Sequence, residues 1–229
     1  LGVGTGVLEL GVYRGKYLAL LAALHADAGL PVVGVDMFIE RIGQPIPPEH
    51  VPYFIGQITD AVQEAVPGSP APVILAASTA SLDVAALHAH CPAGYSLVSV
   101  DAGHEVGDVM HDLALAASVL SSGGIVALDD AFGAGLPGVT EGLFRFLTEA
   151  GDGEGGLAAF AFCANKLFLC RPAMHATYLA YANWLLTAPD APPYAAEAAR
   201  QAVANAAVGF VPRLAGREMV PFKVGPAPG

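Results

Sequence analysis

Short apolar runs alternate with longer helix-forming stretches along most of this chain. Runs such as residues 32–35 (VVGV) and 124–128 (GIVAL) have the length of buried strands, and the stretches between such runs are rich in Ala and Leu. Strands that alternate with helices form parallel βαβ units, in which helices cover both faces of one sheet. At 229 residues, the chain is long enough for one such domain with an appendage. The sequence therefore predicts a single α/β domain.

Breakers and caps divide this domain into elements. Gly29 and Pro31 end the first expected helix, and a Pro-rich cluster at residues 67–72 precedes the third expected strand. The expected strands cover residues 7–13, 32–36, 73–78, 96–101 and 125–129. The expected helices cover residues 16–28, 52–66, 82–90 (capped by Ser81), 108–120 (stopped by a turn at 121–124) and 137–150.

The last two expected strands form a hairpin. Residues 157–163 and 166–171 are separated only by Ala164 and Asn165, which is too short a link for a parallel crossover. Five parallel strands and this hairpin give a seven-stranded sheet, unlike the six parallel strands of dinucleotide-binding domains. After Arg171 the chain is Ala-rich, with helices expected over 174–186 and 195–208 and an extended tail over 212–229. We therefore expect a domain over residues 1–171 and an extension over residues 172–229.

Composition limits the partners and the compartment. The formal net charge is −11, and because nucleic-acid binding needs clustered Lys and Arg, nucleic acid is not an expected partner. Although 54% of the residues are hydrophobic, no apolar stretch reaches about 18 residues, so no membrane span is expected. Three cysteines without a CxxC pair and the lack of a visible secretory leader predict a cytoplasmic protein. The chain starts almost directly on a strand and without Met, so we expect residues upstream of Leu1.

A strand that runs into a glycine turn is the first candidate for ligand binding. The segment VLELGVYRGK places Glu9 in the strand, Gly11 and Gly15 in the turn, and Tyr13 between the glycines. Glycines let a ligand approach the backbone, and the helix that follows presents unpaired N–H groups. The dinucleotide fingerprint G-x-G-x-x-G is absent, and the acidic Glu9 favours a cationic ligand over a phosphate. We expect a nucleoside cofactor here; the alternative is a plain strand-to-helix turn.

Asp36 is the second candidate, because it ends the second expected strand. An acidic side chain at this point of a nucleoside-binding α/β fold can accept hydrogen bonds from both ribose hydroxyls. The alternative is that Asp36 caps a turn or is a solvated loop residue.

Three further carboxylates follow neighbouring strands. Asp101 ends the fourth expected strand, and Asp129 and Asp130 end the fifth. Adjacent strands lie about 5 Å apart, so these side chains should converge at the sheet edge where open α/β folds bind ligands. Like charges at that distance repel unless a cation lies between them, and an all-oxygen set selects Mg²⁺, Mn²⁺ or Ca²⁺. The alternative is that Asp129 or Asp130 only caps a turn.

Four blocks of the sequence carry a family resemblance: VLELGVYRGKYLALLAA, VVGVDMF, YSLVSVDAGHEVGDVMHDLALAASVLSSGGIVALDDAF and PGVTEGLFRF. In this order they resemble class I methyltransferases related to the macrocin- and novobiocin-type sugar O-methyltransferases and to the cephalosporin-hydroxylase-like group. The resemblance covers residues 7–171. It implies a Rossmann-like α/β sandwich with a mostly parallel seven-stranded sheet and a C-terminal antiparallel hairpin, and it implies binding of S-adenosylmethionine.

The same resemblance implies roles for individual residues. The implied cofactor site consists of Glu9, Gly11, Tyr13, Gly15, Asp36, Ser78 and Asp101. Within this site Asp36 would hold the ribose, and Ser78 would lie near the adenine. The implied metal ligands are Asp101, Asp129 and Asp130, with Mg²⁺ as the expected ion. Substrate hydroxyls would complete the coordination, which lowers their pKa and orients them towards the methyl group.

One position departs from the family pattern. Where the family commonly reads Asp-Gly-Asp-His, this chain reads Asp101, Ala102, Gly103 and His104. The second Asp, which the family pattern suggests as a general base, is therefore missing. His104 is the expected substitute, because an imidazole titrates near neutral pH and can take a proton from a metal-polarised hydroxyl, with Asp101 beside it. The alternative is a loop histidine without a chemical role.

The leading hypothesis is a methyltransferase that uses S-adenosylmethionine and a divalent cation to methylate a hydroxyl of a small molecule, such as a sugar or natural product. A nicotinamide-dependent oxidoreductase is one rival, disfavoured by the missing fingerprint and by the hairpin. A non-catalytic cofactor-binding module is the other, suggested by Gly103 and by the C-terminal extension. A homo-oligomer is left open.

Overall fold

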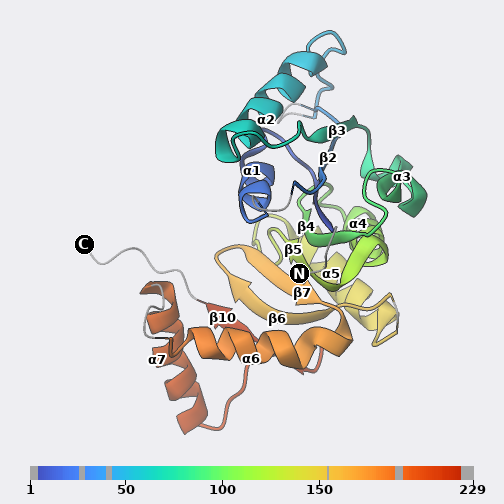
Figure 1. The fold of residues 1–229 in the computed structure, drawn as a ribbon. Coiled ribbons are helices and arrows are strands. Elements are labelled where there is room, and N and C mark those ends of the chain that lie inside the picture. Colours follow the sequence, from blue (N-terminus) through green and yellow to red (C-terminus); the bar gives the residue numbers. More distant parts are fainter. Residues whose placement is uncertain (1–4, 26–28, 40–42, 154, 189–192, 223–229) are drawn as a thin grey trace.

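Eight strands form one sheet in the order β10-β6-β7-β5-β4-β1-β2-β3 (Figure 1). The computed structural model describes residues 5–25, 29–39, 43–153, 155–188 and 193–222. The strands are Gly6–Leu10 (β1), Val32–Asp36 (β2), Val73–Ala76 (β3), Tyr95–Val100 (β4), Leu120–Leu128 (β5), Ala158–Cys163 (β6), Lys166–Cys170 (β7) and Val220–Phe222 (β10). β1 to β5 pair in parallel, β7 is antiparallel to both β5 and β6, and β10 is parallel to β6. The predicted mostly parallel α/β sandwich with a C-terminal antiparallel hairpin is confirmed.

Seven α-helices cover the two faces of the sheet in the part of the chain that the structure describes. They are Lys16–Ala23 (α1), Val51–Ala65 (α2), Val84–His88 (α3), Val106–Val119 (α4), Pro137–Ala150 (α5), His175–Leu185 (α6) and Pro193–Ala207 (α7). One face packs against α3, α4 and α5; the other packs against α1 and α2 at the β1–β3 side and against α6 and α7 at the β6–β10 side. No described helix is long and apolar enough to cross a membrane.

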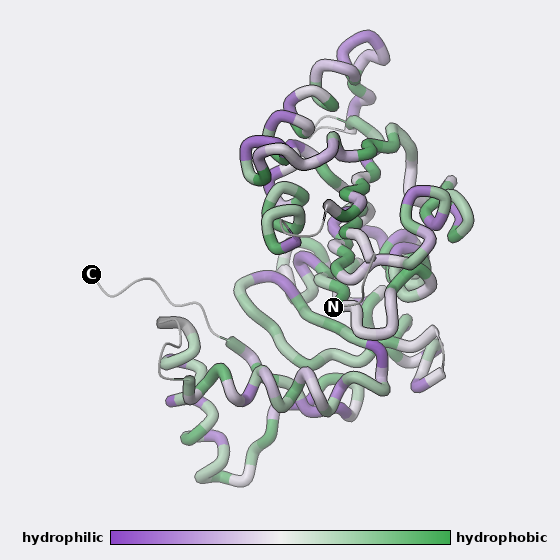
Figure 2. The backbone as a smooth tube through the Cα atoms, in the orientation of Figure 1, coloured by the Kyte–Doolittle hydropathy of each residue, from purple (hydrophilic) through white to green (hydrophobic). Residues whose placement is uncertain are grey.

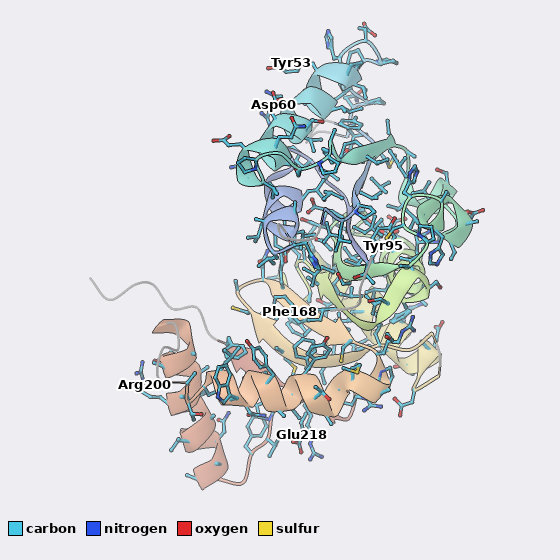
Figure 3. All side chains as sticks on the ribbon, in the orientation of Figure 1. Tyr53, Asp60, Tyr95, Phe168, Arg200 and Glu218 are labelled. Atoms are coloured by element: carbon cyan, nitrogen blue, oxygen red, sulfur yellow. The ribbon has the colours of Figure 1, made fainter. Side chains whose placement is uncertain are left out.

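Side-chain alternation assigns residues to the two faces. Val33 and Val35 of β2 belong to the core under α4 and α5, whereas Val32 packs against the cluster under α1 and α2. Figure 2 shows the central strands as mostly hydrophobic, as expected for strands that are covered on both faces. Tyr95 of β4, labelled in Figure 3, is fully buried, and its hydroxyl donates a hydrogen bond of 2.8 Å to the carbonyl of Leu87.

The predicted start of the third helix is wrong. Ser81 lies in a short 3-10 turn, Thr79–Ser81 (η2), and α3 begins only at Val84. Its cap is Asp83, whose Oδ1 accepts a hydrogen bond of 2.8 Å from the backbone N–H of Ala86. Asp and Ser both cap helices well, so the residue type alone did not decide between the two positions.

The predicted turn at residues 121–124 lies inside β5. This strand begins at Leu120, directly after α4, and the register with β4 shifts between the pairs Tyr95–Leu120 and Leu97–Ile125. A Cβ atom at Gly124 would lie 2.9 Å from the carbonyl oxygen of Tyr95. The glycine is therefore required by a close approach of two strands, and this requirement has the same sequence signal as a turn.

The C-terminal tail is also more regular than predicted. Residues Arg213–Leu214 (β8) and Arg217–Glu218 (β9) form a small antiparallel hairpin, and β10 then adds an eighth strand to the main sheet. His175 at the start of α6 lies with Nε2 2.9 Å from the carbonyl oxygen of Glu218 and 3.1 Å from that of Ala159. The extension is thereby attached to the sheet. Residues 223–229 of the expected tail, and residues 26–28 of the first expected helix, lie outside the described residues.

Candidate active site

A cleft of about 440 Å³ opens at the carboxyl ends of β1 to β4. Its volume lies in the range of small-molecule sites, about 300–1,000 Å³, and its place is where open α/β sheets bind ligands. Six predicted site residues line it: Gly11, Tyr13, Asp36, Ser78, Asp101 and His104. The predicted residues Glu9, Gly15, Asp129 and Asp130 lie outside this lining. Six of the ten predicted site residues therefore line one cleft.

Gly11 allows the ends of β1 and β4 to touch. Its φ is +86°, and a Cβ atom on it would lie 2.0 Å from the carbonyl oxygen of Asp101. Gly15 has a different task, because a Cβ atom on it would lie 3.0 Å from the side chain of Ile58 on α2. Gly11 thus shapes the cleft, whereas Gly15 lets α1 start close to α2.

Asp36 connects the glycine turn to the loop after β2. Its Oδ2 accepts a hydrogen bond of 2.7 Å from the backbone N–H of Tyr13, and its Oδ1 accepts one of 2.6 Å from that of Phe38. Both donor residues have the left-handed backbone that is uncommon outside glycine, with φ of 50° and 53°. Each carboxylate oxygen keeps a further lone pair, so Asp36 can still accept from ribose hydroxyls. This structural role of Asp36 was not predicted.

Glu9 lies below the cleft and is 2% exposed. Burial, and then the charge of Asp101, raise the pKa of Glu9 to about 8, although Lys166 acts in the opposite direction. Its carboxyl group is therefore mostly protonated at neutral pH. This weakens the argument that a negative charge on Glu9 selects a cationic ligand. The side chain faces the interior of the protein.

Asp101 and His104, which line the cleft, converge with Asp130, which lies outside the lining. One ligand atom from each lies within 4.8 Å of the other two, and Nε2 of His104 lies 4.0 Å from Oδ1 of Asp101. Burial, followed by the neighbouring Asp129 and then Asp130, raises the pKa of Asp101 to about 7. Two carboxylates and an imidazole at this separation are a suitable donor set for a divalent ion.

Asp129 lies next to Asp101 and also contacts a lysine, and it is not part of the group formed by Asp101, His104 and Asp130. Its Oδ1 lies 3.2 Å from Nζ of Lys166, and both side chains are 13% exposed. Sequence reasoning did not single out Lys166. The signal was available, because β7 begins at Lys166 and runs antiparallel to β5, with Leu167 opposite Leu128. A residue that starts β7 must therefore lie beside the residue that follows β5.

Asp108 of α4 occupies the space next to Gly103, the position at which the chain departs from the family pattern. A Cβ atom built on Gly103 would lie 2.4 Å from Cβ and 2.6 Å from Oδ2 of Asp108. Asp108 also lines the cleft. A carboxylate is therefore present at this wall of the cleft, but a helix supplies it instead of the loop.

Gly103→Asp should destabilise the protein, because the new side chain would overlap Asp108. We expect a loss of about 1–3 kcal/mol in the free energy of unfolding, measured by urea denaturation. Adding Asp108→Gly should recover most of this loss. Gly107→Asp is the matched control, since nothing lies within 4 Å of a Cβ atom there. Equal effects of Gly103→Asp and Gly107→Asp would contradict this account of the wall.

Glu9→Gln should change how stability depends on pH. Because the pKa of Glu9 rises from 4.5 to about 8 on folding, the folded state binds more protons than the unfolded state between these values. Wild-type stability is therefore lost as the pH rises through this window. A Gln does not titrate, so from about pH 5 to about pH 9 the variant should gain a few kcal/mol relative to wild type. Urea denaturation at both pH values measures this, and a pH-independent difference would contradict it.

Comparisons with known proteins indicate the family and the fold of this chain. A family model described as a methyltransferase domain matches residues 8–131. The crystal structure of CalS11, a calicheamicin methyltransferase, is 19% identical over 73% of this chain and 72% of that chain, with a TM-score of 0.54. The O-methyltransferase NovP is 15% identical over 74% of this chain and 72% of that chain, with a TM-score of 0.50. At these identities the two structures show the shared fold alone.

No curated protein sequence matches the chain. The family model nevertheless covers more than half of the residues, from β1 through the strand end that carries Asp129 and Asp130. The chain therefore belongs to the methyltransferase domain family, and it is a class I, S-adenosylmethionine-dependent methyltransferase.

Proposed function

We propose that this methyltransferase acts on a hydroxyl group of a small molecule, with a divalent ion at the end of its cleft. The single observation that carries the proposal is one continuous cleft. It has Asp36 and the glycine turn along its wall and the converging Asp101 and His104 at one end. A nucleoside site therefore lies next to groups that can move a proton from an acceptor.

The cofactor is proposed to lie along the residues that line the cleft. Asp36 accepts hydrogen bonds from the ribose hydroxyls through its remaining lone pairs. Gly11 and Tyr13 lie along the methionine part, and Ser78, at the end of β3, lies near the adenine. Gly15 contributes only indirectly, by placing the start of α1. When bound, S-adenosylmethionine supplies an electrophilic methyl group on a sulfonium centre.

Asp101 and Asp130 are the proposed carboxylate ligands of the ion. Their ligand atoms and that of His104 lie within 4.8 Å of one another, and the crowding of Asp101 by Asp129 and Asp130 makes a cation there favourable. Such an ion, when bound, lowers the pKa of a coordinated hydroxyl. Mg²⁺ and Mn²⁺ both suit a carboxylate and water environment.

His104 is the proposed general base. As the acceptor oxygen forms its bond to the methyl carbon and the carbon–sulfur bond breaks, the hydroxyl proton passes to the imidazole. The carboxylate of Asp101, 4.0 Å away, then stabilises the imidazolium. The products are a methyl ether and S-adenosylhomocysteine, and the proton returns to solvent from the exposed ring.

The proposed acceptor is a sugar or a related natural product. The apo structure of CalS11, with a TM-score of 0.53, is named as that of a TDP-rhamnose 3'-O-methyltransferase, and NovP is named as an O-methyltransferase. These names suggest the panel of acceptors with which to begin, namely nucleotide-linked and free deoxysugars.

Asp36→Asn should weaken binding of S-adenosylhomocysteine by about 10- to 100-fold, because one charged acceptor of the ribose hydroxyls is lost. Isothermal titration calorimetry measures the affinity. Asp60→Asn, an exposed carboxylate on α2 that Figure 3 labels, is the control and should bind like wild type. If wild type binds no S-adenosylhomocysteine at millimolar ligand, the proposed function is wrong.

His104→Ala should lower methyl transfer to an accepted hydroxyl compound by about 10²- to 10⁴-fold, the usual contribution of a general base. Transfer of a radiolabelled methyl group to the deoxysugar panel measures this. The affinities for S-adenosylhomocysteine and for Mn²⁺ should stay within about threefold of wild type, since neither should depend on a base. A loss of Mn²⁺ binding would instead make His104 a metal ligand.

A further inference from the structure

Lys166 is a largely buried cation at the edge of the proposed ion site. Its Nζ lies 3.2 Å from Oδ1 of Asp129 and 4.0 Å from the centroid of the Tyr17 ring. Three separate elements meet here, since Lys166 starts β7, Asp129 follows β5, and Tyr17 lies in the first turn of α1. The side chain is 13% exposed, and these partners replace part of the water that surrounds an exposed ammonium group.

The ammonium group interacts electrostatically with several acidic side chains. It forms an ion pair with Asp129, and its charge also acts on Glu9 and on Asp101. Glu9 and Lys166 lie on the same face of the sheet, the face covered by α1 and α6, because Leu8 and Leu167 point into the opposite core. Phe168, labelled in Figure 3, lies two residues along the same strand and faces α6.

We propose that Lys166 holds Asp129 out of the metal coordination. Its ammonium group also supplies part of the positive charge that balances the carboxylates of Asp101, Asp129 and Asp130. Two observations support this. Asp129 contacts the ammonium group although it also lies next to Asp101, and the group whose ligand atoms converge consists of Asp101, His104 and Asp130 without Asp129. This inference rests on the proposed function, because it concerns the affinity of the proposed ion.

Two consequences follow for the ion. The affinity of an oxygen site for a divalent cation depends on how many charged ligands it offers, so a site with two carboxylates binds more weakly than one with three. The ammonium group also repels the incoming cation. Lys166 therefore makes ion binding weak and reversible. It also keeps the carboxylates of Asp101, Asp129 and Asp130 close together when the ion is absent.

The test measures Mn²⁺ binding by electron paramagnetic resonance with S-adenosylhomocysteine present. Lys166→Met releases Asp129 and removes the repulsion, so Mn²⁺ should bind at least about tenfold more tightly. Lys16→Met, an exposed lysine of α1, is the matched control and should bind like wild type. Equal Mn²⁺ affinity of Lys166→Met and wild type would overturn the proposal.

Asp129→Asn gives a second test in case Lys166→Met does not fold. If Lys166 keeps Asp129 from the ion, this variant should change Mn²⁺ affinity by less than about threefold. In the Lys166→Met background the same substitution should remove most of the gain. A loss of about tenfold or more from Asp129→Asn alone would show that Asp129 is already a ligand and would overturn the proposal.

Binding of S-adenosylhomocysteine separates the two levels of failure. If each folded variant binds S-adenosylhomocysteine but the Mn²⁺ affinities do not follow this pattern, the role of Lys166 is wrong and the proposed cofactor site stands. If wild type does not bind S-adenosylhomocysteine, the proposed function itself fails.

Discussion

Mutual repulsion among acidic side chains at one edge of the sheet is the constraint on which the site depends. Parallel strands end at the same edge, so carboxylates that follow or lie near those ends are brought together. Each is stabilised in a different way: Asp36 by two backbone N–H groups, Glu9 by keeping its proton, and Asp129 by Lys166. Asp101 and Asp130 converge with the imidazole of His104, where we propose that a cation binds.

The hydrogen bonds of Asp36 and the backbone of Gly11 explain the shape of the cleft. Because Asp36 accepts from Tyr13 and Phe38, the glycine turn and the loop after β2 keep a fixed separation before any ligand arrives. Gly11 brings the ends of β1 and β4 into contact, which closes the floor. A cofactor therefore meets a wall that is largely organised in advance, and this reduces the conformational entropy that binding must overcome.

Most of the fold was predictable because its signals are local and repeated. The boundaries of β2 and α5 follow from apolar runs between Gly and Pro residues, and the two-residue link at Ala164 and Asn165 is too short for anything but a hairpin. One error arose because glycine has two uses: Gly124 is needed for a close approach of strands instead of a turn. The other error was to miss β10, because this strand is only three residues long.

The site was predictable where strand order alone fixes a position, as for Gly11, Asp36 and Asp101. The contacts of a side chain were not predictable where several possible partners lie within its reach. Asp129 and Asp130 are adjacent in sequence, yet one contacts Lys166 and the other lies near His104. Asp130 has a left-handed backbone, with φ of 51°, and a change of backbone direction between two neighbours cannot be inferred from composition or period.

The eighth strand has a consequence for how the molecule behaves in solution. Without β10 the hydrogen-bonding edge of β6 would be open, and an open apolar edge is a template on which a second chain can add a strand. β10 covers that edge with three residues, the middle one being Pro221, which has no N–H group to donate to a further strand. The segment after residue 171 thus ends the sheet in a form that discourages aggregation.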